Sequence, residues 1–191
     1  MKRIYFLTML ALAICVLSGC SNYSKDYNKN TLIVKRNNSL VEVAVEDFEG
    51  MSVNAEDLTS YIDEQIDAYN DNHEKKSVKR ASIDTDDMNK AKLVIAYKNI
   101  ESYNGFNLLD SVLDDLSNVE EAELKGNYKA ADGKEVSFEK LSDTEGAKVL
   151  VLSQKTDVVV KGEILYYNEQ VTVKDGIAAC SGNDKAVIIF K

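Results

Sequence analysis

The sequence predicts an α+β fold: an antiparallel β-sheet with two amphipathic helices on one face, and a β-rich C-terminal half. Three observations lead to this prediction. Short β-prone runs separated by turn residues occur along most of the chain, and two segments carry apolar residues at helical spacing. Beyond Leu124 only strand-like runs follow. The apolar content of 45% is that of a folded globular protein.

The first expected elements are a hairpin and a helix. Two β-prone runs, 31–36 and 40–46, flank Asn37 and Asn38, and Asn tolerates the positive φ of tight turns. Asn54 is the expected N-cap of the helix, which ends in the polar run 70–76. The residues of its apolar stripe recur every three or four positions: Ala55, Leu58, Ile62, Ile66 and Tyr69.

A second hairpin and a second helix are expected next. Runs 77–84 and 91–98 flank a polar loop, and residues 106–116 carry apolar side chains at helical spacing. In the C-terminal half, Asp132-Gly133 between alternating runs predicts a further hairpin. The remaining short runs are expected to be strands: 149–152, 158–161, 164–167, 171–173, 177–180 and 186–190.

The N-terminal segment has the three parts of a secretory signal peptide. A basic start at Lys2 and Arg3 precedes an apolar stretch, 4–17, and then the small residues Ser18 and Gly19. That stretch is shorter than the ~20 apolar residues a membrane span requires. A signal peptide over residues 1–19 is therefore expected. If it were a plain secretory signal, Cys20 would be incidental.

Leu17-Ser18-Gly19-Cys20 resembles the lipobox of bacterial membrane lipoproteins. The resemblance implies that the signal is cut before Cys20 and that Cys20 is lipidated, with acyl chains such as palmitate. It implies attachment to the cell membrane at its extracytoplasmic face. Two acyl chains suffice for stable anchoring. Residues 20–30, which lack apolar periodicity, are expected to form the lipidated Cys and a flexible tether, and 31–191 a single globular α+β domain.

The C-terminal part carries a second resemblance. The runs 158–167 (VVVKGEILYY) and 186–190 (AVIIF) resemble small uncharacterised lipoproteins of gut Firmicutes. This resemblance covers about the last third of the chain and implies no activity.

The net charge limits the partners. It is −9 for the chain and becomes −11 once Lys2 and Arg3 leave with the signal. A negative surface repels phosphate backbones, so no nucleic-acid partner is expected. The expected partners are the membrane, through the lipid anchor, and a protein or peptide.

Few residues suggest chemistry. His73 is the only histidine, which excludes a His-based metal cluster, and it is expected in solvent at a helix end. Cys180, among small apolar residues, is expected to be buried. Ser137 and Lys140 match Ser-x-x-Lys but fall on an expected strand, which puts the two side chains on opposite faces. The loop 84–89 lacks the third ligand and the turn glycine of a calcium loop.

We therefore expect no catalytic residue, no cofactor and no metal, with Cys20 as the one site residue, a lipidation site. The expected function is a cell-surface lipoprotein of unknown molecular activity that acts as a non-enzymatic binding or interaction module. The alternative is an extracytoplasmic hydrolase acting on cell-wall material through carboxylates that the sequence does not identify.

Overall fold

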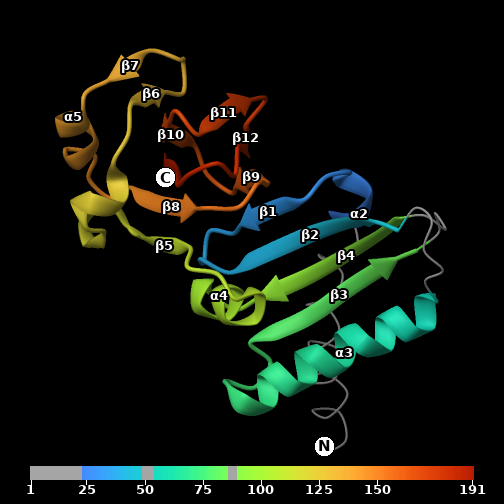
Figure 1. The fold of residues 1–191 in the computed structure, drawn as a ribbon. Helices are drawn as coiled ribbons and strands as arrows, with labels where there is room; N and C mark the ends of the chain where they lie inside the picture. Colours follow the sequence, from blue (N-terminus) through green and yellow to red (C-terminus); the bar gives the residue numbers. More distant parts are fainter. Residues whose placement is uncertain (1–22, 49–53, 86–89) are drawn as a thin grey trace, which may run out of the picture.

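The α+β class and the β-rich C-terminal half are confirmed in the computed structural model, which describes residues 23–48, 54–85 and 90–191. The strands form two sheets rather than one (Figure 1). The helices are α2 (Tyr23–Asp26), α3 (Ala55–Asn72), α4 (Ile100–Asn107) and α5 (Phe138–Ser142). Two short 3-10 turns are η1 (Leu116–Asn118) and η2 (Glu121–Leu124).

The larger sheet, sheet A, has the order β11-β12-β9-β1-β2-β4-β3. Its β1–β2 hairpin turns at Asn38, whose φ is 62°, as the sequence predicts. β1 also pairs with β9 in parallel, and the other pairs are antiparallel. Its strands are β1 (Thr31–Val34), β2 (Leu40–Asp47), β3 (Val78–Asp84), β4 (Lys90–Tyr97), β9 (Asp157–Val160), β11 (Val171–Lys174) and β12 (Ile177–Cys180).

The smaller sheet, sheet B, is antiparallel with the order β5-β8-β13-β10-β6-β7. The predicted turn at Gly133 connects β6 to β7, with φ 83° at the glycine. Its strands are β5 (Val112–Asp115), β6 (Tyr128–Ala130), β7 (Glu135–Val136), β8 (Lys148–Leu152), β10 (Ile164–Asn168) and β13 (Ala186–Phe190).

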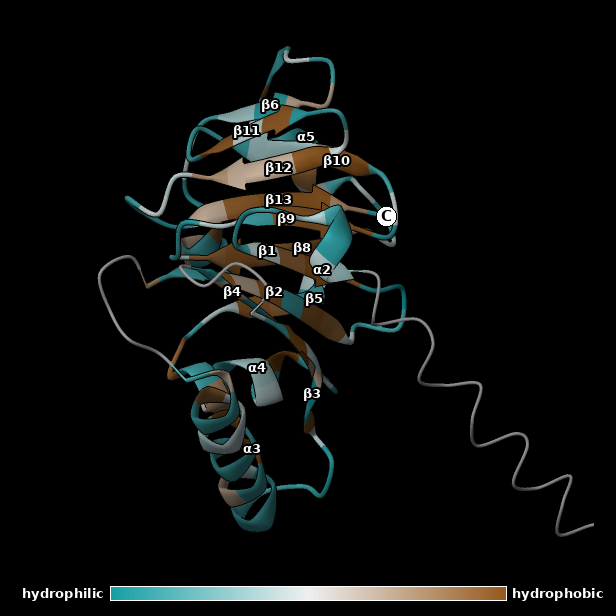
Figure 2. Ribbon diagram, turned by 90° about the vertical axis from the view of Figure 1, so that its right-hand side faces the viewer, coloured by the Kyte–Doolittle hydropathy of each residue, from teal (hydrophilic) through white to brown (hydrophobic). Residues whose placement is uncertain are grey.

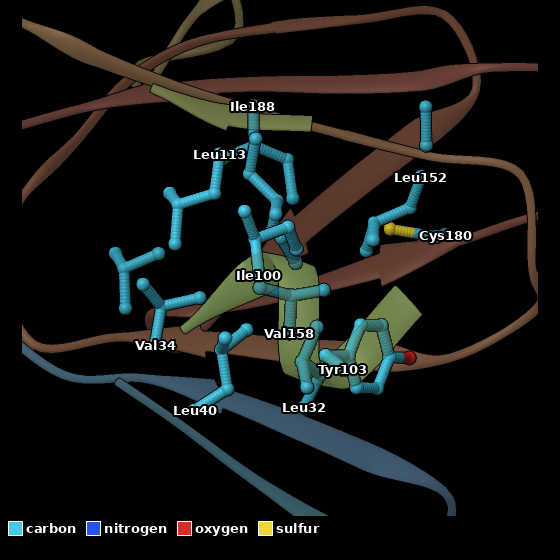
Figure 3. Packing of buried hydrophobic residues seen from close by; sticks show 14 of the residues in the cluster. Leu32, Val34, Leu40, Ile100, Tyr103, Leu113, Leu152, Val158, Cys180 and Ile188 are labelled. Carbon is cyan, nitrogen blue, oxygen red and sulfur yellow. The ribbon is translucent and has the colours of Figure 1, made fainter. Parts of the chain in front are cut away.

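The main core lies between the two sheets. Figure 3 shows Leu32 and Val158 of sheet A facing Leu152 and Ile188 of sheet B, with Tyr103 of α4 beside them. Smaller clusters cover the outer faces. The residues of β13 are buried on both faces, which explains why Ala186–Phe190 is a continuous apolar run rather than an alternating one. Figure 2 shows this apolar middle of the body, with the more polar α3 at one end.

Helix α3 begins at the predicted N-cap, because the Asn54 side chain accepts hydrogen bonds from the backbone N–H groups of Glu56 and Asp57. It packs along β3 at the edge of sheet A (Figure 1). Ile66 is buried, whereas Leu58 and Ile62 are only partly buried. The prediction that all three lie in the core is therefore correct in full only for Ile66.

The predicted helix over 106–116 is wrong. Helix α4 begins earlier, at Ile100, with Asn99 as its N-cap, and Leu108 ends it with a φ of 56°. The Asn104 side chain then bonds both backbone groups of Ser111, accepting from N–H at 3.1 Å and donating to C=O at 2.7 Å. Beyond this turn the chain pairs with β8 as β5. Pairing between distant strands outweighs the local helical spacing there.

Residues 23–30, expected to belong to a flexible tether, are instead folded against sheet A. Tyr23 and Tyr27 pack on the cluster at its outer face, and Ser24 is buried. The Lys92 ammonium donates to Ser24 O at 3.1 Å, and the Asn30 side chain accepts from the N–H of Val45. The two tyrosines supply the apolar surface that holds this polar segment against the sheet. Two isolated tyrosines form no regular apolar pattern, so the sequence did not predict this contact.

Candidate functional site

Two of the sequence-based interpretations fall outside the described residues. Cys20, the expected lipidation site, precedes the first described residue, as does the whole expected signal peptide. The loop 84–89 is described only at residues 84 and 85. Both interpretations stay predictions.

His73 and Cys180 lie where the sequence places them. His73 is exposed at the C-terminal end of α3, with its ring stacked on Tyr69 at 4.0 Å between centroids. Cys180 is 4% exposed on β12, where burial, and after it the charge of Asp157, raises the pKa of its thiol to about 12. A buried thiol with so high a pKa is not a nucleophile, and its place in the core separates it from the exposed histidine.

Ser137 and Lys140 correct the expectation of a strand. Ser137 is the N-cap of α5, so the pair falls at a helix start. The backbone N–H of Glu139, and after it the hydrogen bond from the Ser137 side chain, lower the pKa of the Glu139 carboxyl. The serine is therefore engaged by an acid, and both motif residues are exposed.

The strongest candidate site is a cavity of about 680 Å³ beside α5, which we call the acidic-rim pocket. Six buried or half-buried apolar residues line it, and we call them its floor: Leu116, Val119, Leu124, Phe138, Leu141 and Ala147. Four exposed carboxylate residues also line it, and we call them its rim: Asp115, Glu121, Glu139 and Glu145. An apolar floor with a few charged groups around it is typical of a binding site.

The pocket exists because short, irregular elements cover the outer face of sheet B. Residues of β8 and β13 such as Val149 and Ile189 pack there against Leu116, Leu124 and Leu141. The Tyr128 hydroxyl donates to Leu124 O at 2.7 Å and so fixes η2 over the sheet. The two 3-10 turns, η1 and η2, and the short helix α5 supply most of the residues that line the pocket.

The charge around the pocket is almost purely negative. No Lys or Arg is among the residues that line it, and Lys148, outside the lining, places its Nζ 3.9 Å from the Asp115 carboxylate. Hydrogen bonds hold the pKa of Glu139 below its ordinary value, so this carboxyl stays ionised. The pocket is therefore suited to a ligand that combines an apolar group with positive charge.

A second acidic group is half-buried, at a position where sequence reasoning did not place one. Glu42 lies on β2 beneath α4, and it accepts hydrogen bonds from the Tyr97 hydroxyl at 2.6 Å and from Asn107 Nδ2 at 3.4 Å. Burial raises the pKa of Glu42, and those two hydrogen bonds oppose the rise. In the sequence, Glu42 alternates with valines. By itself this alternation predicts a strand position that faces solvent, so it gives no sign of the contact with Tyr97.

The described residues contain neither a cluster of metal-ligating side chains nor a membrane-spanning helix. Within residues 23–48, 54–85 and 90–191, no group of three His, Cys, Asp or Glu side chains could hold a metal ion. Among the helices of the same described ranges, none has the length and apolar character to cross a membrane.

In comparisons with known proteins, no family model, no curated protein and no solved structure matches this chain.

Proposed function

We propose that this protein is a cell-surface binding module, anchored through lipid on Cys20, whose ligand site is the acidic-rim pocket. The single observation that supports the site is the apolar floor of the pocket surrounded by four carboxylates. The proposed occupant is a peptide segment that places an apolar side chain on the floor and Lys or Arg side chains at the rim. Such charge complementarity favours both encounter and specificity.

The binding proposal is tested with a fluorescent peptide of alternating leucine and lysine. Saturable binding to the full protein is expected. The Glu121→Lys/Glu145→Lys variant should weaken it at least about tenfold, because both changes put cations at the rim. A peptide of glycine and lysine should not bind, since it lacks the apolar group.

A matched control separates the pocket from the overall negative charge. Glu46 and Glu64 are exposed residues of β2 and α3 that do not line the pocket. Glu46→Lys/Glu64→Lys changes the net charge by the same amount and should leave binding intact. Equal weakening by the two double variants would show non-specific attraction and remove the pocket from consideration.

The anchoring proposal has its own test. Cys20→Ser removes the only thiol that the lipobox resemblance assigns to lipid, so the variant should leave the membrane fraction or remain an unprocessed precursor. Mass spectrometry and lipid labelling of the two proteins give the answer. Wild-type mass and labelling in the variant would contradict lipidation at Cys20.

The alternative, a hydrolase acting on cell-wall material, requires a carboxyl that can donate a proton at the site. At the pocket, Glu139 has a lowered pKa, which is unsuited to that role. The carboxyl with a raised pKa, Glu42, lines neither this pocket nor the two other cavities described below. These observations favour binding, and release of soluble fragments from purified cell wall by the protein would reverse the preference.

A further inference from the structure

The described surface includes a local basic region, although the protein as a whole is acidic. Two neighbouring cavities of about 790 Å³ and 260 Å³ share Lys35, Arg36, Lys161 and Gly162 in their linings. We call them together the basic pocket pair. The larger has no Asp or Glu in its lining, and the smaller adds Lys148 and Lys191.

The fold concentrates these cations. Lys35 and Arg36 lie in the β1–β2 turn, and Lys161 follows β9, the parallel neighbour of β1. Arg36 Nε donates to Lys161 O at 3.4 Å. A side chain at Gly162 would meet the Lys191 carbonyl oxygen, with its Cβ only 2.0 Å away, so glycine is needed for the chain to pass so closely beside β13.

The acids nearest in the chain lie outside the linings of the two cavities. Asp26 lies on α2 and Glu163 follows Gly162, yet neither lines either cavity. Acids on distant parts of the protein, more than a Debye length of about 8–10 Å away, are largely screened at physiological salt. The cations can therefore act locally despite the net charge of −9.

The position of Tyr23 links the basic pocket pair to the proposed anchor. Tyr23 lines the larger cavity, and Lys35 Nζ lies 5.9 Å from the centroid of its ring. Only two residues separate Tyr23 from Cys20, so the two Cα atoms are at most ~11 Å apart even with the chain fully extended. A lipid on Cys20 thus requires this face of the domain to lie close to the bilayer.

We propose that the basic pocket pair docks on the anionic lipid headgroups of the membrane to which Cys20 attaches the protein. The proposal rests on the anchoring proposed above. It assigns to the face beside α2 the role of orienting the domain, which leaves other faces to bind partners. Each Lys or Arg near an anionic surface strengthens membrane contact roughly fivefold, so three cations give an effect on the order of 100-fold.

The test uses the protein purified from membranes and reconstituted in vesicles of phosphatidylcholine alone or with phosphatidylglycerol. Acetylation rates of individual lysines are measured by mass spectrometry. Phosphatidylglycerol should slow the labelling of Lys35 and Lys161 at least about fivefold and leave exposed Lys79 and Lys174 unchanged. High salt should reverse the protection. Equal labelling of Lys35 in the two vesicles would overturn the proposal.

Variants identify the groups responsible. Arg36→Gln/Lys161→Gln retains Lys35 as the reporter and should remove most of its protection by phosphatidylglycerol. Lys79→Gln/Lys174→Gln removes the same charge from β3 and β11 and should leave that protection intact. In a third experiment, inorganic phosphate is added at matched ionic strength to the protein on neutral vesicles, and the labelling of Lys35 is measured again. If phosphate protects Lys35 on neutral vesicles as well as the lipid does, the site binds free phosphate and the headgroup assignment is wrong.

The same preparation separates failure of docking from failure of anchoring. Its mass shows whether Cys20 is lipidated. A lipidated protein floats with both kinds of vesicle, and the labelling decides the outcome. A protein without lipid contradicts the anchor, and it should still float with phosphatidylglycerol vesicles alone if the docking is real. Flotation with neither would reject both.

Discussion

The Tyr97 hydroxyl donates a 2.6 Å hydrogen bond to the Glu42 carboxylate from the neighbouring strand, beneath α4. Asn107 Nδ2 joins the group through a 3.0 Å hydrogen bond to the Tyr97 oxygen. Burial raises the pKa of Glu42, so the folded protein binds this proton more tightly than the unfolded chain does. The stabilisation is therefore complete below the unfolded value of ~4.3 and is lost as pH rises through the higher folded value.

Glu42→Gln should remove this part of the pH dependence. The glutamine amide carries no charge at any pH and its carbonyl oxygen can still accept from Tyr97. The melting temperature of the wild type should fall relative to the variant as the pH rises above the unfolded value of ~4.3 and through the higher folded pKa of Glu42. Thermal melts across that range measure the difference, with Glu64→Gln, an exposed α3 change, as the control. If the melting temperatures of wild type and Glu42→Gln changed in parallel with pH, the pKa of Glu42 would not be raised by folding.

Tyr97→Phe should destabilise the protein by about 1–3 kcal/mol at neutral pH, because it leaves a buried carboxylate short of a donor. Combined with Glu42→Gln the same change should cost less, since no charge is then left without its partner. Urea denaturation of the two single variants and the double variant gives the coupling free energy. If the losses of unfolding free energy in the two single variants added up to that of the double variant, the hydrogen bond between Tyr97 and Glu42 would contribute nothing to stability.

Asp63→Asn should weaken the attachment of α3 to β3 by less than about 1 kcal/mol, because the ion pair is partly exposed. Arg80 donates to the two Asp63 oxygens at 2.6 and 2.7 Å and holds the pKa of Asp63 below its usual range. The stabilisation is therefore present above the unfolded value of ~3.9 and is lost as pH falls through the lower folded value. Denaturation of wild type and Asp63→Asn at pH 7 and pH 2 checks this. If the variant were still less stable than the wild type at pH 2, the difference at pH 7 would not come from the ion pair.

Ile66→Ala should lower the free energy of unfolding by about 2–5 kcal/mol, the usual range for a buried isoleucine. Ile66 lies in the main core and is 6% exposed. Ile62→Ala should cost less, since Ile62 packs at the margin of that core. Chemical denaturation of both variants ranks them. Were Ile62→Ala the more damaging change, the packing of α3 would differ from that described.

Cys180 should resist thiol reagents in the native protein and react after unfolding, because its burial raises the pKa and excludes the reagent. Mass spectrometry of the peptide that contains residue 180, before and after urea, measures this. Cys180→Ser should lower the free energy of unfolding by about 1–3 kcal/mol, because it buries a hydroxyl. Cys180→Ala, which removes volume without adding a polar group, separates the two effects. Rapid native labelling would show that β12 opens readily.

Local sequence signals predicted the elements that local physics determines. Asn54 caps α3, Asn38 takes the positive φ of the first hairpin, and Gly133 takes that of another. They failed for residues 108–116, where apolar spacing suited a helix but pairing with β8 and the contacts of Asn104 to Ser111 produced a turn and a strand. They also failed for Tyr23 and Tyr27, whose packing partners lie on distant strands.

The candidate sites were less predictable than the elements. The apolar floor of the acidic-rim pocket joins Leu116 to Leu141 and Ala147, which only the folding of short elements onto sheet B brings together. The basic pocket pair likewise joins Lys35 to Lys161 through the parallel β1–β9 pairing. No spacing along the chain encodes either grouping.

By itself the sequence determined the α+β class, the strand-rich C-terminal half, the main turns and caps, and the burial of Cys180. These follow from side-chain periodicity, backbone preference and polarity, which act over a few residues. Only the tertiary structure decided the division into two sheets, the parallel contact of β1 with β9, the partial burial of Glu42 and the opposite charges of the two pocket regions. Each of these depends on which distant segments pair and pack, and that choice is made by the free energy of the whole core rather than by any local run of residues.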